Sequence, residues 1–507
     1  MQVTAARRDG LVLAVILVVA AALRLAALPG GGEWDDDQGA QLLTMLHWVR
    51  DGQAPDLGPL SSFGTAHHGV AFYWLLAPAA FLTDVDPVAA VATMAVIGLA
   101  GVAATWWLGR TVAGPLAGHV AGSLMAISPA AVGASTFVWN SNVIGPAAAV
   151  ATAAGWHAWR TRRPWWWVVA AVGTVLMMQS HLLAVLAVPP LIGLLLADLL
   201  GRSRGVQRQM LAPVLCAVAV VVAGYLPLLL HEARHDFSES RAIIDYLWHD
   251  GGRTLPEPTG SWPAGLPVIV WRVLTWPLSG FVQSAPLAGF PALFVVLTAM
   301  AIAVLSTSGT ARQYGRWAVA TTIWAIVALS VVSPSLGVIT AGLPTDQYHG
   351  WLDPILVVIV AVAAAQLWNS ATTLGRVTGA SITASCVALS LFAMPPPSSP
   401  DGGWPSARAA AERIRSHTGG GPVAVTGVAK AGTSLSFPLQ RAGTTVVDTV
   451  SAKYLVVVCD PLFERAVGMP CGGPAEMTIA AQVGFPAVKM VDQFTDSPRR
   501  VVCVFAR

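Results

Sequence analysis

The sequence is poor in charge, and this excludes an ordinary soluble fold. Only 11% of its 507 residues are charged, whereas 55% are hydrophobic. A soluble globular domain carries roughly 25% charged residues. The five cysteines are too few to hold a small disulfide-stapled scaffold together. The composition therefore predicts a polytopic α-helical membrane protein.

Several motifs that would indicate other functions are also missing. No Walker A loop and no GxGxxG turn follows a strand-like segment, so a nucleotide-driven pump is not expected. The chain has no serine nucleophile elbow. No residue is assigned as a metal ligand on the basis of spacing, and neither a resident cofactor nor a nucleic-acid partner is predicted.

Apolar runs long enough to cross a hydrocarbon core recur along the chain. About eleven are expected to span a core of about 30 Å: 11–28, 87–109, 112–130, 142–159, 164–179, 182–200, 211–230, 286–306, 317–333, 350–367 and 377–394. The run 67–82 is also apolar, but if it crossed, the cationic loops would no longer share one side. Because cationic loops stay in the cytoplasm, we expect 67–82 to lie in the interface or to re-enter. The chain is then a multi-pass protein of the cytoplasmic (plasma) membrane with a cytoplasmic amino terminus.

The expected spans divide the chain into three parts. A membrane module covers 1–394 and has two large exterior loops, 29–86 and 231–285. The proline-rich residues 395–403 form a stiff linker. Residues 404–507 have the composition of a small soluble domain. An odd number of spans places this tail domain outside the cytoplasm.

The tail domain is expected to mix helix and strand in an α/β fold. Its hydrophobic pattern predicts one helix and three Val-rich strands, at 405–417, 422–426, 454–458 and 500–505. Cys459 and Cys471 lie in this exterior domain, where a disulfide is chemically permitted. Two free thiols are the alternative, because connectivity cannot be read from a sequence.

The first exterior loop begins with a cluster of acids. The stretch from Glu33 to Asp37 follows the first span, and a short helix is predicted from Asp37 to Arg50, ended at Gly52. One carboxylate in hydrocarbon costs roughly 3 kcal/mol, so these side chains must lie at the water interface. Crowded carboxylates near an apolar surface suit general base catalysis, and their oxygens could hold a divalent cation. A solvated acidic turn is the alternative.

Two cationic or titratable residues on the same side could bind an anion. His68 precedes Tyr73 in the interfacial run, and a protonated histidine at headgroup depth can bind a phosphate. An interfacial aromatic belt would explain the same segment. Arg24, near the outer end of the first span, could face an anion or extend to the headgroups.

Polar residues also interrupt two later apolar regions. Gln179 and His181 lie at an outer turn within the long apolar stretch 164–200. Polar groups at such depth usually face a cavity, although a simple turn between two helices accounts for them as well. Tyr348 and His349 reach the same outer rim just before a late span.

In this layout the chain resembles the GT-C glycosyltransferases, especially the branch of the lipid A aminoarabinose transferases and protein O-mannosyltransferases. Asp37-Gln38 stands at the acidic pair of that family's first exterior loop, with Gln38 in place of an acid. His68 to Trp74 is similar to its interfacial Lys/His-Pro-Pro-x-x-Tyr-Trp segment, with both prolines missing. Ser180-His181 is similar to its Thr-Lys-Gly turn, with His181 in place of the lysine.

The resemblance implies an inverting transfer of a sugar from a polyprenyl-phosphate donor to an acceptor glycan, lipid or protein at the outer membrane face. The lipid-linked sugar is then a substrate, and membrane lipids are partners. The implied site comprises the catalytic pair Asp37 and Asp36, the donor-phosphate ligands Arg24, His68 and His181, and the pocket residues Asp35, Tyr73, Gln179, Tyr348 and His349.

Two functions of other classes use the same features. A transporter or flippase of an amphiphilic anion would need the same cations without covalent chemistry. Paired inverted helices, which would favour a transporter, are not evident in the sequence. A non-catalytic scaffold of the cell envelope would instead use the tail domain for binding.

Overall fold

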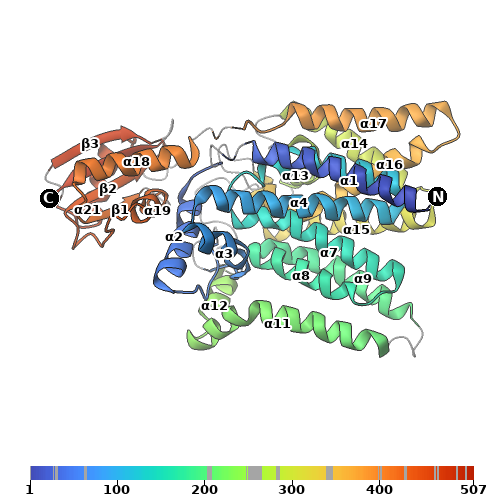
Figure 1. The fold of residues 1–507 in the computed structure, drawn as a ribbon, viewed down its shortest axis with the longest axis horizontal. Helices are drawn as coiled ribbons and strands as arrows, with labels where there is room; N and C mark the ends of the chain where they lie inside the picture. The colour runs from blue at the N-terminus through green and yellow to red at the C-terminus, as the bar shows by residue number, and fades with distance from the viewer. Residues whose placement is uncertain are drawn as a thin grey trace.

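The protein is a bundle of apolar helices with a small sheet-containing domain at one end (Figure 1). This computed structural model describes residues 2–26, 28, 32–61, 66–202, 208–246, 248, 265–280, 286–338, 346–397, 399, 402–427, 431–461, 464, 468–486, 489–496 and 500–507. The amino terminus and the tail domain lie at opposite ends of the molecule. We refer to these as the amino-terminal end and the tail-domain end of the bundle.

Each predicted span coincides with an apolar helix of the bundle. These are α1 (Gln2–Leu25), α4 (Pro87–Ala113), α5 (Pro115–Ile127), α7 (Ile144–Thr161), α8 (Trp166–Ser180), α9 (Val188–Leu200), α11 (Leu211–Arg234), α14 (Pro286–Val304), α15 (Gly309–Val332), α16 (Asp353–Trp368) and α17 (Thr373–Phe392). Within the described residues, seven helical segments are long and apolar enough to cross a membrane. The expectation of a polytopic membrane protein is confirmed.

Helix α16 forms the centre of the bundle. Every residue from Asp353 to Ala365 is buried, and the helix is apolar around its whole circumference. Such a helix belongs in a core rather than on a lipid-facing surface. It packs against α4, α5, α14 and α17, which separates it from the surrounding membrane.

The loop 231–285, which the sequence predicts to be exterior, contains helices that the sequence did not predict. It holds α12 (Ser238–Asp245) and α13 (Leu266–Ser279), while residues 249–264 lie outside the described part. A Cβ on Gly265, just before α13, would lie 3.0 Å from the Cα of Gly337. At the other end of α13, the Ser128 hydroxyl donates to the Pro277 carbonyl at 2.7 Å. Both neighbours lie at the tail-domain end, so α13 enters the bundle without crossing it.

The interfacial run predicted at 67–82 forms α3 (Ala71–Thr83), which lies beside α2 in Figure 1. Its 13 residues span only about 20 Å, less than a hydrocarbon core. Asp84 at its end accepts two hydrogen bonds from Arg50, at 3.0 and 2.7 Å. Both ends of α3 therefore lie at the tail-domain end, as expected for an interfacial helix.

The tail domain has a four-stranded sheet of order β1-β2-β4-β3. Its elements are α18 (Gly403–Thr418), β1 (Val423–Gly427), α19 (Thr433–Arg441), β2 (Tyr454–Cys459), α21 (Pro474–Gln482), β3 (Lys489–Thr495) and β4 (Val501–Ala506). Strands β1 and β2 are parallel, whereas β4 is antiparallel to β2 and β3. The predicted helix and three strands are confirmed. Cys459 and Cys471 form a disulfide, one of the two alternatives.

Candidate functional site

The acidic stretch begins helix α2 (Asp36–Asp51), with Asp35 as its N-cap. The Asp35 carboxylate accepts from the Asp36 amide, and the Gln38 side chain accepts from the Asp35 amide at 2.8 Å. These contacts form a capping box, which satisfies two amides at the start of the helix. At the other end Gly52 is left-handed with φ 71°, a conformation that glycine adopts without strain. The predicted helix and its end at Gly52 are confirmed.

Asp36 faces the tail domain. Its Oδ1 accepts from the Thr433 amide at 2.6 Å, and the Thr433 hydroxyl lies 2.5 Å from the same oxygen. Thr433 is the first residue of α19, so the carboxylate lies at the partially positive end of that helix. Burial raises the pKa of Asp36 from 3.8 to about 6, although the Thr433 hydrogen bonds act in the opposite direction.

A buried aromatic cluster fixes the tail domain next to α2. The Trp34 indole donates to the Ser434 carbonyl at 2.8 Å. Its ring centroid lies 4.8 Å from that of Trp404 and 5.6 Å from that of Phe437. Arg500 donates to the Trp34 carbonyl at 2.9 Å. The residues preceding the acidic helix are therefore part of an interdomain contact.

Asp37 is half-buried and lies one helical turn before Gln41. Gln41 Nε2 donates to Asn140 Oδ1 at 2.9 Å, and Asn140 Nδ2 donates to the Ser180 carbonyl at 2.6 Å. Burial raises the pKa of the Tyr73 phenol to about 12, and the charge of Asp37 adds to this rise. A buried polar path therefore runs from the Asp37 side of α2 to the end of α8.

Three aromatic rings continue this path. The His181 ring stacks on Tyr348 with a centroid distance of 4.1 Å and an interplanar angle of 16°. The centroid of the His68 ring lies 5.1 Å from that of the His181 ring, with the two planes tilted by 37°. His68 comes from the segment before α3, His181 follows α8, and Tyr348 lies in the 3-10 turn η7 (Asp346–Leu352). The structure thus brings together three residues predicted from separate parts of the sequence.

Both histidines of the stack are neutral at pH 7. Burial lowers the pKa of His68 to about 4 and that of His181 well below its usual value. His181 Nδ1 accepts from the Leu183 amide at 3.2 Å, so its proton is on Nε2. His68 Nδ1 is buried and has no hydrogen-bond partner among the described residues. The imidazoles can therefore donate to an anion as neutral N–H groups, rather than as the protonated histidine that the sequence suggested.

Gln179 connects the stack to the interfacial segment. Its Oε1 accepts from the Ala71 amide at 3.0 Å. A Cβ on Gly69 would lie 2.4 Å from this oxygen, so a larger residue at position 69 would have to displace the Gln179 side chain. Gly69 occupies one of the two positions that are proline in the Lys/His-Pro-Pro-x-x-Tyr-Trp motif, which the segment His68 to Trp74 resembles. Glycine in place of proline fits the structure at position 69, because the Gln179 side chain fills the space that a proline ring would need.

Arg24 is fully buried and holds helices together. Its guanidinium donates to the carbonyls of Ala20, Ala126 and Met125 and to the Ser135 hydroxyl, at 2.9 to 3.3 Å. These acceptors belong to α1 itself, to the end of α5 and to the segment after α6 (Pro129–Gly133). The geometry gives Arg24 a structural role, and the structure does not place it in the stack of rings.

His349 lies in a separate buried cluster behind Tyr348. Its Nε2 lies 3.4 Å from Asp346 Oδ1. The same carboxylate accepts from Arg272 Nε at 2.7 Å and from Nη2 at 3.2 Å. Arg272 also donates to the carbonyls of Leu336 and Val338. This pair anchors α13 to η7, and it fixes the backbone that carries Tyr348.

Sequence reasoning missed several members of these networks: Gln41, Asn140, Arg272 and Asp346. Each is polar and buried next to an apolar run, and such residues usually face a cavity or a partner in a membrane protein. A polar residue beside an apolar run can be recognised in a sequence, so all four could have been chosen as candidates. Which residue pairs with which could not be read, because the partners are far apart in sequence.

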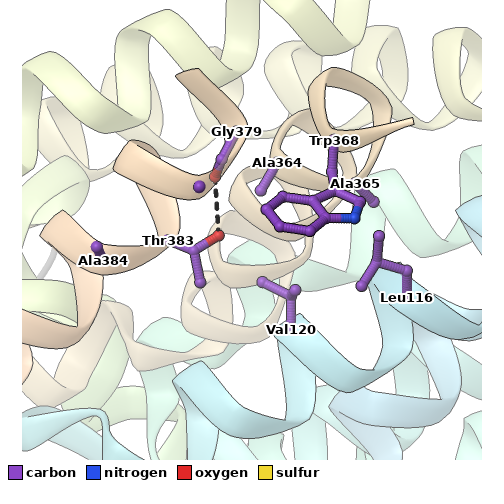
Figure 2. A pocket seen from close by; sticks show the side chains of 9 residues that line it. Leu116, Val120, Ala364, Ala365, Trp368, Gly379, Thr383 and Ala384 are labelled. Carbon is purple, nitrogen blue, oxygen red and sulfur yellow. Dashed lines mark hydrogen bonds between the residues drawn. The ribbon is translucent and has the colours of Figure 1, made fainter. Parts of the chain in front are cut away.

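The cavity drawn in Figure 2 lies far from this site. It has about 380 Å³ of space between α5, α16 and α17. The Trp368 ring lies along it, and the Thr383 hydroxyl donates to the Gly379 carbonyl at 3.0 Å. Trp368 ends α16, whereas η7 precedes the start of that helix. The cavity is apolar and belongs to the amino-terminal end of the bundle, so it does not contribute to the site at α2.

Comparisons with known proteins agree on one fold. Residues 67–231 match the family described as dolichyl-phosphate-mannose-protein mannosyltransferase. The chain is similar to the structure of ArnT from Cupriavidus metallidurans bound to undecaprenyl phosphate, with 16% identity, a TM-score of 0.58 and 97% of both chains covered. A structure of the Archaeoglobus fulgidus oligosaccharyltransferase is similar over 89% of this chain and 68% of that one, with 14% identity and a TM-score of 0.57.

A further structure from Archaeoglobus fulgidus holds a lipid phosphate. It is the oligosaccharyltransferase AglB in complex with an inhibitory peptide and a dolichol-phosphate. It shares 11% identity with the chain, with a TM-score of 0.54 and coverage of 90% of this chain and 70% of that one. No curated protein sequence matches the chain significantly. At these identities the likeness to solved structures establishes the fold.

Proposed function

Because the chain has the fold of the GT-C membrane glycosyltransferases, we propose that it is an inverting glycosyltransferase. It moves a sugar from a polyprenyl-phosphate donor to an acceptor glycan, lipid or protein at the outer face of the cytoplasmic membrane. The observation that carries this proposal is the path of buried polar groups from the Asp37 side of α2 to the stack of His68, His181 and Tyr348.

Asp37 is the proposed general base. It lies beside the polar path and is half-buried, so it can meet an acceptor from the water side. The acceptor oxygen attacks the anomeric carbon, its proton passes to the Asp37 carboxylate, and the bond from that carbon to the donor phosphate breaks. The products are the glycosylated acceptor, with inverted configuration at the anomeric carbon, and a polyprenyl phosphate.

His68 and His181 are the proposed ligands of the donor phosphate. Neutral imidazoles have N–H groups that donate to the phosphate oxygens, and charge builds up on these oxygens as the bond breaks. Donors preorganised in a dry site stabilise such charge strongly. Tyr348, which stacks on His181, and Tyr73 are the proposed residues that contact the substrate beside these histidines. A lipid-phosphate leaving group is supported by the undecaprenyl phosphate and dolichol-phosphate in the two similar structures.

In this proposal the other predicted site residues hold helices and rings in place and do not contact the substrate. Asp35 caps α2 and Asp36 holds the tail domain. Arg24 joins the ends of α1 and α5, while Gln179 and His349 support the stack from two sides. The catalytic pair predicted from the resemblance is thereby reduced to Asp37.

A transfer assay tests the proposal. Membranes that contain the full chain are supplied with a panel of radiolabelled polyprenyl-phosphate sugars, and loss of label from the lipid is measured. We expect wild-type protein to consume one donor and Asp37→Asn to slow transfer by roughly 10²- to 10⁴-fold, the usual contribution of a general base. Asp51→Asn is the matched control, since Asp51 is an exposed acid at the end of the same helix.

Two results would contradict the proposal. Full activity of Asp37→Asn together with abolition by Asp35→Asn would remove Asp37 from the reaction. Protein-dependent movement of a labelled lipid across the membrane, with no donor consumed, would instead indicate a transporter.

A further inference from the structure

The backbone that carries His68 is paired with the segment before it. The Gly58 amide donates to the His68 carbonyl at 2.9 Å, and the His68 amide donates to the Pro59 carbonyl at 2.9 Å. Leu60 lies opposite His67 in this antiparallel pair. In an extended segment successive side chains point to opposite sides. The contact that holds His67 on one side therefore also sets the place of the His68 ring on the other.

Glu239 of α12 accepts from both donors of His67. Its Oε2 accepts from the His67 amide at 2.5 Å, and its two oxygens lie 3.2 and 3.3 Å from His67 Nδ1. His67 and Leu60 exchange no hydrogen bonds across the pair, so the His67 amide points away from that segment. The Glu239 carboxylate is buried and depends on these donors in turn. Neither residue was among the predicted site residues.

Helix α12 is itself fixed by α11, which it follows at the tail-domain end of the bundle (Figure 1). Glu232, in the last turn of α11, accepts from the amides of Glu239 and Ser240 at 2.8 and 3.0 Å and from the Ser240 hydroxyl. The turn between the helices places Asp236 and Phe237 in the left-handed region, with φ 53° and 57°. Residues other than glycine keep this conformation only where surrounding contacts hold it. Helix α12 is therefore a fixed support for the Glu239 side chain.

Two further contacts hold the backbone around His68. On the α11 side, His231 Nδ1 lies 3.0 Å from Oδ2 of Asp56, in the loop that pairs with His68. On the α8 side, Gln179 accepts from the Ala71 amide at 3.0 Å. The Glu239 contact is the nearest of these to His68, because it acts on the adjacent residue.

We propose that Glu239 is a positioning residue of the donor-phosphate site: by holding His67, it fixes the ring of His68 next to His181. This inference rests on the proposed function, in which these two imidazoles bind the donor phosphate. Their ring centroids are 5.1 Å apart, and donors stabilise the developing charge only where they are preorganised. Displacing such a group by about 1 Å can cost roughly 10²-fold in rate. Helix α12 thus contributes to the site without touching the substrate.

A double-mutant cycle with His68 is the test. The purified full chain in detergent is titrated with radiolabelled undecaprenyl phosphate, the lipid named in the similar ArnT structure, and kcat is measured with the donor that wild-type membranes consume. We expect Glu239→Ala to weaken lipid-phosphate binding and to lower kcat, by roughly 10- to 100-fold in kcat. In a His68→Ala background Glu239→Ala should add little, because it acts through His68. A purely structural role of α12 would instead make the two losses add.

Two variants serve as controls. Glu239→Gln keeps a carbonyl oxygen that accepts from the His67 amide, so it should bind undecaprenyl phosphate more tightly than Glu239→Ala does. It also remains informative if the alanine variant fails to fold. Ser238→Ala alters an exposed residue at the start of the same helix and should leave binding and kcat unchanged.

The outcomes separate this inference from the proposed function. Wild-type affinity for undecaprenyl phosphate in Glu239→Ala, or additive losses in the cycle, would overturn the positioning role while leaving glycosyl transfer intact. The absence of undecaprenyl phosphate binding by the wild type would also overturn it. Binding that depends on Glu239 through His68, with no donor consumed by the wild type, would support the positioning role and contradict the proposed transfer.

Discussion

Asp36→Ala should weaken the interdomain contact, whereas Asp36→Asn should preserve it. Alanine removes the acceptor of the Thr433 amide and hydroxyl. Hydrogen bonds to a charged group contribute about 1.5–3 kcal/mol each, so loss of the two should weaken docking by roughly 3–6 kcal/mol. Asparagine keeps an Oδ1 acceptor and removes the buried charge. It should therefore preserve docking.

The pH dependence separates these two effects. Burial raises the pKa of Asp36 from 3.8 to about 6. A rise of about two pKa units corresponds to roughly 3 kcal/mol between the two protonation states. Because the docked pKa is the higher one, docking is most favourable below pH 4 and weakens as the pH rises through about 6. Asp36→Asn should abolish this dependence.

Hydrogen exchange at the start of α19 and in α2 is the appropriate assay. Protection is measured in the full chain from pH 5 to 8 and corrected for the intrinsic exchange rate. Wild-type protection should fall with increasing pH, Asp36→Asn should stay protected, and Asp36→Ala should be weakly protected throughout. Equal loss of protection in the asparagine and alanine variants at pH 7.5 would refute the reasoning.

Two further predictions concern buried pairs. Arg272→Met leaves Asp346 buried without its bidentate partner, so the free energy of unfolding should fall by roughly 3–5 kcal/mol; an unchanged thermal midpoint in detergent would contradict the pairing. Cys459→Ser/Cys471→Ser opens a loop with a sequence separation of 12, which should destabilise the tail domain by roughly 2–4 kcal/mol. Faster labelling of the buried Cys503 would report this loss, and unchanged labelling would contradict it.

The helices of the bundle were predictable because each long apolar run has few structures available to it in a membrane. Helix α13 was not, because Arg272 lies in its middle and it is only 14 residues long. Its burial depends on Asp346, which lies in η7. A buried arginine is costly when it is alone and is tolerated when a carboxylate pairs with it. The sequence does not show that Arg272 pairs with Asp346.

The acidic stretch shows the same limit within one helix. Its place and its end at Gly52 were predictable from capping rules. The separate tasks of Asp35, Asp36 and Asp37 were not, because successive helix residues point about 100° apart. Only the docking of α19 shows which face Asp36 occupies. Gln38, which stood out as a replaced acid, has its own explanation as the partner of Asp35 in the capping box.

Gly39 has a consequence for protein engineering. A Cβ at this position would lie 2.2 Å from the Thr433 carbonyl oxygen, so α2 and α19 meet where only a hydrogen atom fits. The tail domain in Figure 1 is for this reason not an interchangeable module. A chimaera that takes its tail domain from a similar protein must therefore take the matching α2 as well. If only the residues after the linker are exchanged, the new tail domain would not pack against α2 of the membrane module.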